Sequence, residues 1–335
     1  MENRTCTFHL QTVHPDEVLK IVKALKMSKS TGLDSIDAWT LKLVINDILP
    51  ALTHVLNLSI TSLVFPDIWK LSKVIPLLKK DDPLNPKNYR PVALLPVMSK
   101  ILERVVFMQV VQYVEGQGLL HPSHHGSRSK HSTSTAMIEM YDTWVDSIEK
   151  EEMAGVMMID LSAAFDLVDH SILLKKLELF GFDQQAVVWF WSYLTSRSQC
   201  VHVDGKTSEL KPVNVGVPQG SVLGPLMYIL FVNDLPEVVH GHRGHQVEQA
   251  QVLFNMNCSE CGGLCCYVDD STYVFSNSDP RVLTERLTNQ YSKLASYRGD
   301  NRLVINDDKT HLLVMATPKY AKGSFPIEKA TKLGN

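Results

Sequence analysis

Three carboxylates lie at the ends of short apolar segments, which is a placement that suits metal-dependent chemistry. Asp160 ends one apolar run, and Asp269 and Asp270 lie together between two further runs. If these runs are neighbouring strands, the three acids meet at one edge of a sheet. Magnesium prefers a few carboxylates together with substrate phosphates, and two such ions stabilise the attacking and the leaving oxygen of an in-line phosphoryl displacement. An Asp-Asp pair alone is weak evidence, because turns also favour aspartate.

The segments around these acids predict a mixture of helices and strands. Apolar residues recur at helical spacing in some segments and form short runs in others. We expect helices over about 15–25, 38–63 (interrupted at Pro50), 99–113, 136–150, 171–180, 184–196, 222–233 and 280–296. We expect strands over about 74–78, 90–95, 155–160, 200–203, 211–215, 265–268, 271–275, 303–305 and 311–315.

Charge is nearly balanced over the whole chain but not along it. The 335 residues include 33 Lys and Arg against 36 Asp and Glu, for a formal net charge of −3. A global basic signature for nucleic-acid binding is therefore absent. Residues 69–104, however, carry eight basic and three acidic side chains, which is a local charge of +5. On a hairpin this window would form a phosphate-binding surface, and the alternative is an ordinary solvated face.

Composition excludes several classes of protein. With 44% hydrophobic and 21% charged residues, the chain is not disordered, collagen-like or a coiled coil. Its longest apolar run, near 222–232, is too short to cross a bilayer, so we expect no membrane partner. The polar N-terminus predicts no secretory signal. Four of the six cysteines lie between 258 and 266, unlike the spread-out cysteines of a secreted disulfide framework.

Four motifs occur in order along the chain. They are Asn88–Pro96 (NYRPVALLP), Asp160 followed by Ala164–Asp166 (AFD), Gly216–Ser221 (GVPQGS) and Tyr267–Asp270 (YVDD). Together they resemble the reverse transcriptase domain of a non-LTR (LINE-type), jockey-like retrotransposon. Each motif alone is weak, whereas four in order with an acid at each expected place are highly specific. The resemblance extends from about residue 28 to residue 310.

The resemblance implies an α+β right-hand polymerase fold with fingers and a palm, and with the thumb absent. The palm would be a small antiparallel sheet backed by helices. The implied boundaries are a helical N-terminal extension over 1–65, fingers over 66–135 and a palm over 136–317, which includes a Cys- and His-rich insertion at about 237–266. Residues 318–335 would be the truncated start of the primer-grip and thumb region.

The resemblance also assigns roles to the acids and to one lysine. Asp160 and Asp269 would hold two Mg²⁺ ions, and Asp270 would be the third acid of the site, with a weaker or indirect metal contact. Lys309 would be the lysine that protonates the pyrophosphate leaving group. For Lys309 the alternative is a surface lysine in a hairpin.

Three basic residues of the predicted hairpin would bind the incoming triphosphate. Arg90 would grip the phosphates, which a forked guanidinium does well. Lys79, on the turn, would contact the same phosphates as a point charge, and its neighbour Lys80 could do so instead. A plain surface lysine remains the alternative.

Three further residues would border the nucleotide. Phe165 lies five residues after Asp160, where in the family an aromatic ring crowds the sugar 2′ position and selects deoxynucleotides. The alternative is an ordinary core phenylalanine. Gln219 and Gly220 would border the nucleotide and template pocket, with glycine permitting close approach of the backbone.

The insertion near 237–266 contains a candidate zinc site. Cys258 and Cys261 have the C-x₂-C-G spacing of a zinc knuckle. Zinc needs four Cys or His ligands in tetrahedral geometry, and Cys265 and His245 are candidates for the others. The alternative is an insertion loop with free thiols.

The resulting functional hypothesis is an RNA-directed DNA polymerase that adds dNTPs to the 3′-OH of a DNA primer on an RNA or DNA template. Alternatives are a catalytically inactive nucleic-acid-binding remnant of the same fold, a zinc-dependent interaction module, and an RNA-dependent RNA polymerase, against which Phe165 speaks. The family's way of life implies localisation in the cytoplasm and nucleus. Protein partners are not predicted.

Overall fold

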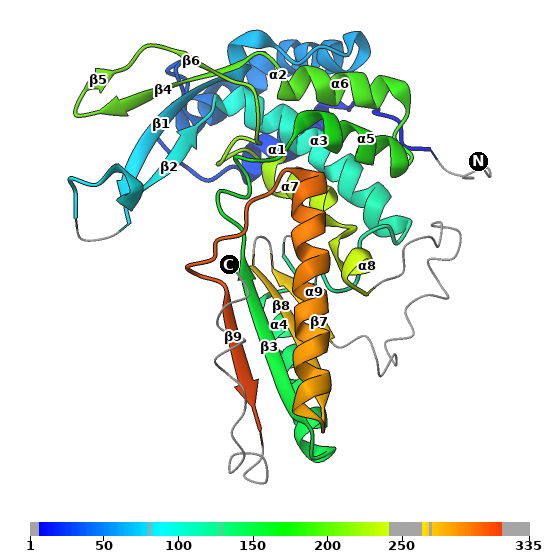
Figure 1. Ribbon diagram of the computed structural model, residues 1–335. Helices are drawn as coiled ribbons and strands as arrows, with labels where there is room; N and C mark the ends of the chain where they lie inside the picture. Colours follow the sequence, from blue (N-terminus) through cyan, green and yellow to red (C-terminus); the bar gives the residue numbers. More distant parts are fainter. Residues whose placement is uncertain are drawn as a thin grey trace. The chain divides into compact units, whose positions relative to one another are not determined.

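The computed structural model describes residues 7–79, 82–126, 128, 130–240, 263–267 and 270–316. The chain divides into two compact units, each made of two stretches of sequence (Figure 1). Unit 1 comprises residues 1–117 and 168–227, and unit 2 comprises residues 118–167 and 228–335.

Unit 1 is rich in helices. Its helices are α1 (Pro15–Ala24), α2 (Ala38–Ser62), α3 (Val97–Gly116), α5 (His170–Leu179), α6 (Gln184–Leu194) and the short 3₁₀ segments η1 (Asp67–Lys70) and η2 (Pro86–Asn88). Phe65 is fully buried, and its ring packs edge-on against Trp189 and Tyr193 of α6. Such tilted aromatic pairs add to the stabilisation that burial alone provides.

Helix α2 continues through Pro50, so the predicted interruption there was wrong. Proline removes one backbone hydrogen bond inside a helix. The apolar face of α2 is buried on both sides of the proline, by Leu41 and Ile45 before it and by Leu52 and Leu56 after it. We infer that this packing holds the helix together across the missing bond.

By length and composition, α2 is also the one helix among the described residues that could cross a membrane. The same test is passed by core helices of soluble proteins, so it is weak evidence for a membrane span. Its buried face packs within unit 1, and it contacts α1.

The sheet of unit 1 is built on a hairpin. Strand β1 (Leu71–Leu78) pairs antiparallel with β2 (Tyr89–Leu94), as the sequence predicted, and parallel with β4 (Arg197–Val203). Strands β5 (Lys206–Thr207) and β6 (Lys211–Val213) both pair with β4. Strand β4 joins β1, and residues 168–227 belong to the same compact unit as residues 1–117. The predicted boundaries of fingers and palm stay a prediction.

Unit 2 is built on a four-stranded antiparallel sheet. Its order is β7 (Gly263–Tyr267), β8 (Asp270–Asn277), β3 (Met153–Asp160) and β9 (His311–Met315). Its helices are α4 (Thr133–Glu149), α8 (Leu235–His240) and α9 (Pro280–Asn301), while α7 (Gly224–Val232) runs from one unit into the other. The predicted strand at 303–305 is reduced to an isolated bridge between Ile305 and Leu161.

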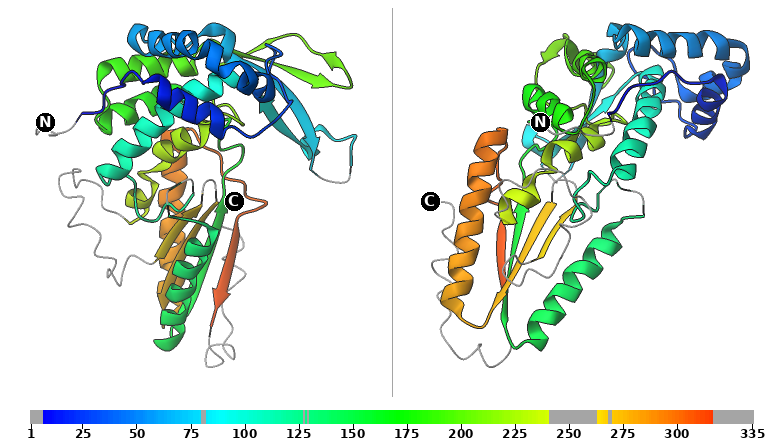
Figure 2. Two further views of the ribbon diagram at one scale, coloured as in Figure 1. Left: turned by 180° about the vertical axis from the view of Figure 1, so that it is seen from behind. Right: turned by 90° about the vertical axis from the view of Figure 1, so that its right-hand side faces the viewer.

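Helices α4 and α9 cover opposite faces of this sheet (Figure 2). Gly155 of β3 faces α9, since a Cβ added there would lie 2.7 Å from Leu287 Cδ1. The Cys265 thiol of β7 faces α4, where it donates to the Ala136 carbonyl at 3.9 Å. Strand register puts these two residues on alternate sides of the sheet. The sheet is thus buried on both faces near its middle, and the ladder of β3 and β8 ends at Asp160 and Asp270.

Candidate active site

Asp160 and Asp270 lie directly opposite each other at the end of the β3–β8 ladder. The register pairs Ile159 with Ser271 and Asp160 with Asp270. Directly opposed residues of an antiparallel pair share one face, with Cβ atoms about 5 Å apart. The predicted convergence of these two acids is therefore confirmed for their backbone positions. Asp269 lies outside the described residues, so its role stays a prediction.

Two side chains from the turn before β9 hold the Asp160 carboxylate. Asn306 donates from Nδ2 to Asp160 Oδ2 at 2.8 Å, and its backbone N–H donates to the Asp160 carbonyl at 2.9 Å. Lys309 Nζ lies 3.2 Å from Oδ1 and 3.1 Å from Oδ2. The Asp160 side chain is 20% exposed and that of Lys309 is 55% exposed. The predicted leaving-group lysine therefore lies at the predicted metal acid, within reach of solvent.

Asn306 is a candidate functional residue that sequence reasoning missed. It opens the turn, and the backbone N–H groups of Lys309 and Thr310 both donate to its carbonyl, at 3.1 and 2.9 Å. Asparagine is common in turns for local reasons, so its presence there carried no sign of a partner. The pairing of β9 with β3 and the bridge between Leu161 and Ile305 bring this turn to Asp160.

Phe165 is partly exposed and is held by a buried tyrosine. Its ring stacks on that of Tyr228, with centroids 4.9 Å apart and an interplanar angle of 28°. Tyr228 is fully buried. The backbone around Phe165 is a series of turns, tied to the rest of unit 2 by a bond from Ser162 N to the Val304 carbonyl at 2.8 Å. The ring is therefore held on one side and partly exposed, and its role in sugar selection stays a prediction.

The predicted nucleotide-binding residues of unit 1 form a second group. Arg90 lies on β2, opposite Leu77 of β1, and Lys79 follows the end of β1. The Lys79 N–H donates to the Asn88 carbonyl at 2.6 Å. Arg90 and Lys79 are both exposed, near the loop that connects the two strands of the hairpin. Lys80 lies outside the described residues.

The glycine-rich turn packs directly on the strand that carries Arg90. The Ala93 N–H of β2 donates to the Gln219 carbonyl at 3.1 Å. Gly220 has a φ of +110°, and a Cβ added to it would lie 2.6 Å from the Ala93 carbonyl oxygen. Glycine is required here both by its conformation and by the space. The structure thus places Gln219 and Gly220 beside Ala93, three residues along β2 from Arg90.

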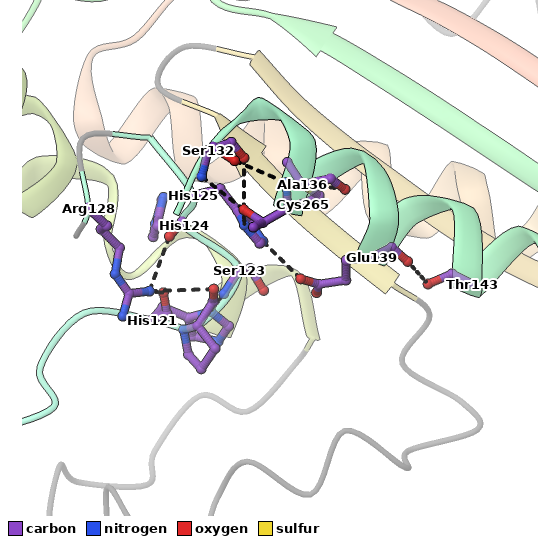
Figure 3. Close-up of polar contacts among 12 residues, drawn as sticks. His121, Ser123, His124, His125, Arg128, Ser132, Ala136, Glu139, Thr143 and Cys265 are labelled. Carbon is purple, nitrogen blue, oxygen red and sulfur yellow. Dashed lines mark hydrogen bonds and ion pairs between the residues drawn. The ribbon is translucent and has the colours of Figure 1, made fainter. Parts of the chain in front are cut away.

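The edge of β7, the strand that leads to the Asp269–Asp270 pair, is covered by the loop before α4 (Figure 3). Cys266 N–H donates to the Ser123 carbonyl at 2.8 Å, and His125 N–H donates to the Cys266 carbonyl at 2.9 Å. His125 Nε2 also lies 2.8 Å from Glu139 Oε2 of α4. Burial lowers the pKa of the neighbouring His124 to about 4. This loop therefore anchors β7 through its backbone and α4 through the His125 side chain.

Cys265 is the one predicted zinc ligand within the described residues. Burial, followed by the nearby Glu139 carboxylate, raises the pKa of its thiol to about 12. Zinc binds the thiolate, so a zinc ion at Cys265 would have to displace the thiol proton. Among the described residues no group of three or more His, Cys, Asp or Glu is arranged to hold a metal ion. His245, Cys258 and Cys261 lie outside the described residues, and the zinc site stays a prediction.

Comparison with known proteins identifies relatives over most of the chain. The family model for reverse transcriptase (RNA-dependent DNA polymerase) matches residues 77–328. The RNA-directed DNA polymerase from mobile element jockey of Drosophila melanogaster is 32% identical over 228 residues, which are 68% of this chain and 25% of that protein. The corresponding jockey protein of Drosophila funebris is 33% identical over 224 residues, 66% of this chain and 24% of that protein.

A third relative aligns over nearly the whole chain. The probable RNA-directed DNA polymerase from transposon BS of Drosophila melanogaster is 28% identical over 321 residues, 95% of this chain and 34% of that protein. The chain therefore spans about a quarter to a third of the length of the curated relatives it matches. The family model and these relatives agree with the motif order, and the chain belongs to the reverse transcriptase family, within which it is a domain of the jockey-like, non-LTR retrotransposon kind.

Proposed function

We propose that this chain is an RNA-directed DNA polymerase domain that adds deoxynucleotides to a primer 3′-OH on an RNA or DNA template. The observation that carries the proposal is the β3–β8 register, which opposes Asp160 to Asp270. The turn that brings Asn306 and Lys309 to Asp160 supports it. In this proposal unit 2 is the palm of a right-hand polymerase, and unit 1 supplies the fingers.

The donor set of the site fits magnesium. Two carboxylates directly opposite each other on a sheet repel, and a hard divalent cation with oxygen ligands relieves that repulsion. We propose that Asp160, Asp269 and Asp270 would hold two Mg²⁺ ions. When bound, the metals supply charge stabilisation for the attacking and leaving oxygens of the displacement.

The chain's own residues then position the carboxylate and move a proton. Asn306 fixes the Asp160 carboxylate by donating to Oδ2, which leaves Oδ1 without that constraint. The Lys309 ammonium, 3.1 Å from Asp160 Oδ2 and half exposed, is a proton donor within the site. A lysine there could protonate the pyrophosphate as it leaves, which is general-acid catalysis.

The remaining proposed roles concern recognition of the nucleotide. Arg90 would bind the triphosphate with its forked guanidinium, assisted by Lys79 or Lys80. Gln219 and Gly220 would border the nucleotide, since their turn lies on the strand that carries Arg90. Phe165 would select against a 2′-OH, because its ring is held by Tyr228 and cannot easily withdraw.

Primer extension tests the proposal. The purified chain is incubated with poly(rA)/oligo(dT), dTTP and Mg²⁺, beside Asp160→Asn and Asp269→Ala variants. Asp142→Asn, which neutralises an exposed acid of α4 in the same unit, is the matched control. We expect extension by the wild type and by the control, and a loss of at least about 100-fold in the other two variants, because each removes a charge that stabilises the transition state.

Two outcomes would contradict the proposal. One is a folded wild-type protein that binds the hybrid but extends nothing, which would favour the catalytically inactive nucleic-acid-binding remnant. The other is extension that survives in Asp160→Asn, which would remove the carboxylate pair from the mechanism. Thermal melting of each variant separates loss of chemistry from loss of fold.

A further inference from the structure

A buried carboxylate lies behind the glycine-rich turn of unit 1. Glu103 is on α3 and is completely buried. Its helix neighbours Ile101, Leu102 and Val106 are buried apolar residues, as expected of a helix face that packs in a core. Within the part of the chain that the structure describes, Glu103 forms no ion pair. A carboxylate in such a place is costly unless hydrogen bonds satisfy it.

Four hydrogen bonds satisfy the Glu103 carboxylate. Ser99 Oγ donates to Oε1 at 2.7 Å, and the Tyr193 hydroxyl donates to Oε2 at 3.4 Å. The backbone N–H groups of Val222 and Leu223 both donate to Oε2, at 2.7 and 3.1 Å. These two amides immediately precede α7, where a helix begins and its dipole favours negative charge. Two of the four donors to Glu103 are therefore backbone N–H groups at the end of the glycine-rich turn.

Hydrogen bonds hold the turn at three points, and at one of them the acceptor is the charged side chain of Glu103. At its start, Gly216 N–H donates to the Val168 carbonyl at 2.9 Å. In its middle, the Gln219 carbonyl accepts from β2 at 3.1 Å. At its end, Glu103 holds the amides of two successive residues. Gln219 and Gly220 lie between the second and third fastenings, so their backbone conformation depends on both.

We propose that Glu103 is a positioning residue for nucleotide binding, which holds the turn 216–223 in the shape that presents Gln219 and Gly220 to the incoming dNTP. The inference rests on the proposed polymerase function. Glu103 touches neither substrate nor metal in this proposal. It acts through the amides of Val222 and Leu223, and its charge makes those hydrogen bonds stronger than a neutral acceptor would.

Three variants distinguish a residue that holds the turn for nucleotide binding from a core residue with no part in nucleotide binding. Glu103→Gln keeps the size and one acceptor oxygen but removes the charge. Glu103→Leu removes both oxygens and leaves the two amides without their acceptor. Ser99→Ala is the matched control, because it deletes another partner of Glu103 that does not belong to the turn.

Amide hydrogen exchange measures the hold on the turn directly. Peptides covering 216–227 are followed in the wild type and in the three variants. We expect exchange at Val222 and Leu223 to rise about 10-fold in Glu103→Gln and further in Glu103→Leu, because a hydrogen bond to a charged group is weakened or lost. Ser99→Ala should change it less than about 2-fold. Unchanged exchange in both Glu103 variants would overturn the proposed hold.

Steady-state kinetics test the connection to the nucleotide. For Glu103→Gln we expect the KM for dTTP to rise about 10-fold while kcat and the affinity for the template–primer hybrid stay within about 3-fold. A variant whose kcat falls together with its melting temperature, at constant KM, would show a merely structural role. A wild-type protein that extends no primer would refute the polymerase function and the nucleotide part of this inference, whereas the exchange result would still decide whether Glu103 holds the turn.

Discussion

Replacing Gly220 with alanine should damage the glycine-rich turn while unit 1 stays folded. The added Cβ would lie 2.6 Å from the carbonyl oxygen of Ala93, and the residue has a φ of +110°. Ala93 cannot withdraw easily, because it pairs with Val74 in the β1–β2 hairpin and its N–H is bonded to Gln219. The turn must therefore move away from β2.

The expected loss has two contributions. An L-residue held in this region of backbone conformation costs about 1–3 kcal/mol. Relieving the close approach breaks the Ala93–Gln219 hydrogen bond, which contributes about 1 kcal/mol. The sum is about 2–4 kcal/mol, which is less than the usual stability of a domain. For a unit of this size that corresponds to a fall in melting temperature of about 4–16 °C.

Two other glycines supply matched controls. Gly205 has a φ of +76° but no atom lies within 4 Å of an added Cβ, so Gly205→Ala isolates the conformational contribution. Gly116 ends α3 with open space around it, and Gly116→Ala should be neutral or stabilising by about 0.5–1 kcal/mol. Circular dichroism melts order the three variants, and the KM for dTTP in primer extension should rise only in Gly220→Ala.

Equal melting temperatures for Gly220→Ala and Gly205→Ala would refute the reasoning about space, since the contact with β2 would then contribute nothing. An unchanged KM for dTTP in Gly220→Ala would refute the reasoning about the site. In that case the turn could shift from β2 without disturbing nucleotide binding, and Gln219 and Gly220 would not border the nucleotide.

Three further predictions follow from the structure. Burial lowers the pKa of His124 from 6.5 to about 4. The folded state therefore favours the neutral imidazole, and the stability that this provides is present above pH 6.5 and is lost as pH falls towards 4. Between pH 7 and pH 5 the free energy of unfolding should fall by about 2 kcal/mol in urea titrations, and His124→Gln should flatten that slope. Asn306→Ala should raise the Mg²⁺ concentration for half-maximal extension and lower kcat about 10-fold, because Asp160 loses the hydrogen bond that orients it. Asp308→Asn, on the same turn, is the control and should change neither quantity. An equal effect of the two variants would contradict the reasoning. Phe165→Val should reduce discrimination against ribonucleotides by about 10- to 200-fold, measured as the ratio of kcat/KM for dTTP and UTP; an unchanged ratio would remove Phe165 as the selective residue.

Local patterns were enough to predict the elements that carry the acids. The apolar run before Asp160 and the short runs on each side of the Asp269–Asp270 pair predicted β3, β7 and β8 with their ends within two residues. A tight hairpin and a buried strand of similar length have few ways to pair, so the convergence of Asp160 and Asp270 could be expected. The β1–β2 hairpin, with its basic residues, was predictable for the same reason.

Pairing between strands far apart in the chain has no comparable local pattern in the sequence. β4 lies parallel to β1, from Leu71 opposite Ser198 to Val74 opposite Val201. The local sequence of neither strand indicates its partner, so the sequence did not predict that residues 168–227 belong to unit 1. The continuation of α2 through Pro50 likewise depends on packing that only the folded unit provides.

Polar residues that act through others were the hardest to find. Glu103 lies in a largely apolar helix, and a glutamate is ordinarily solvated. Its bonds to Val222 and Leu223 form only when these two consecutive residues, 119 and 120 positions further along the chain, pack against it. Asn306 was hidden in the same way by a local turn preference.

Two places where the described part of the chain departs from the local rules of folding are places that the proposed function needs. A sheet gains nothing from setting Asp160 against Asp270, since like charges in direct opposition are destabilising. Glu103 gives the core no stability that an apolar side chain would not provide without the cost of desolvating a charge. Asn306 and Lys309 offset the first departure by satisfying one of the two carboxylates, and the turn amides offset the second. Conflicts of this kind persist where function requires them. The backbone of unit 2 therefore imposes a concentration of negative charge, and unit 1 uses a buried negative charge to shape the turn that would receive the nucleotide.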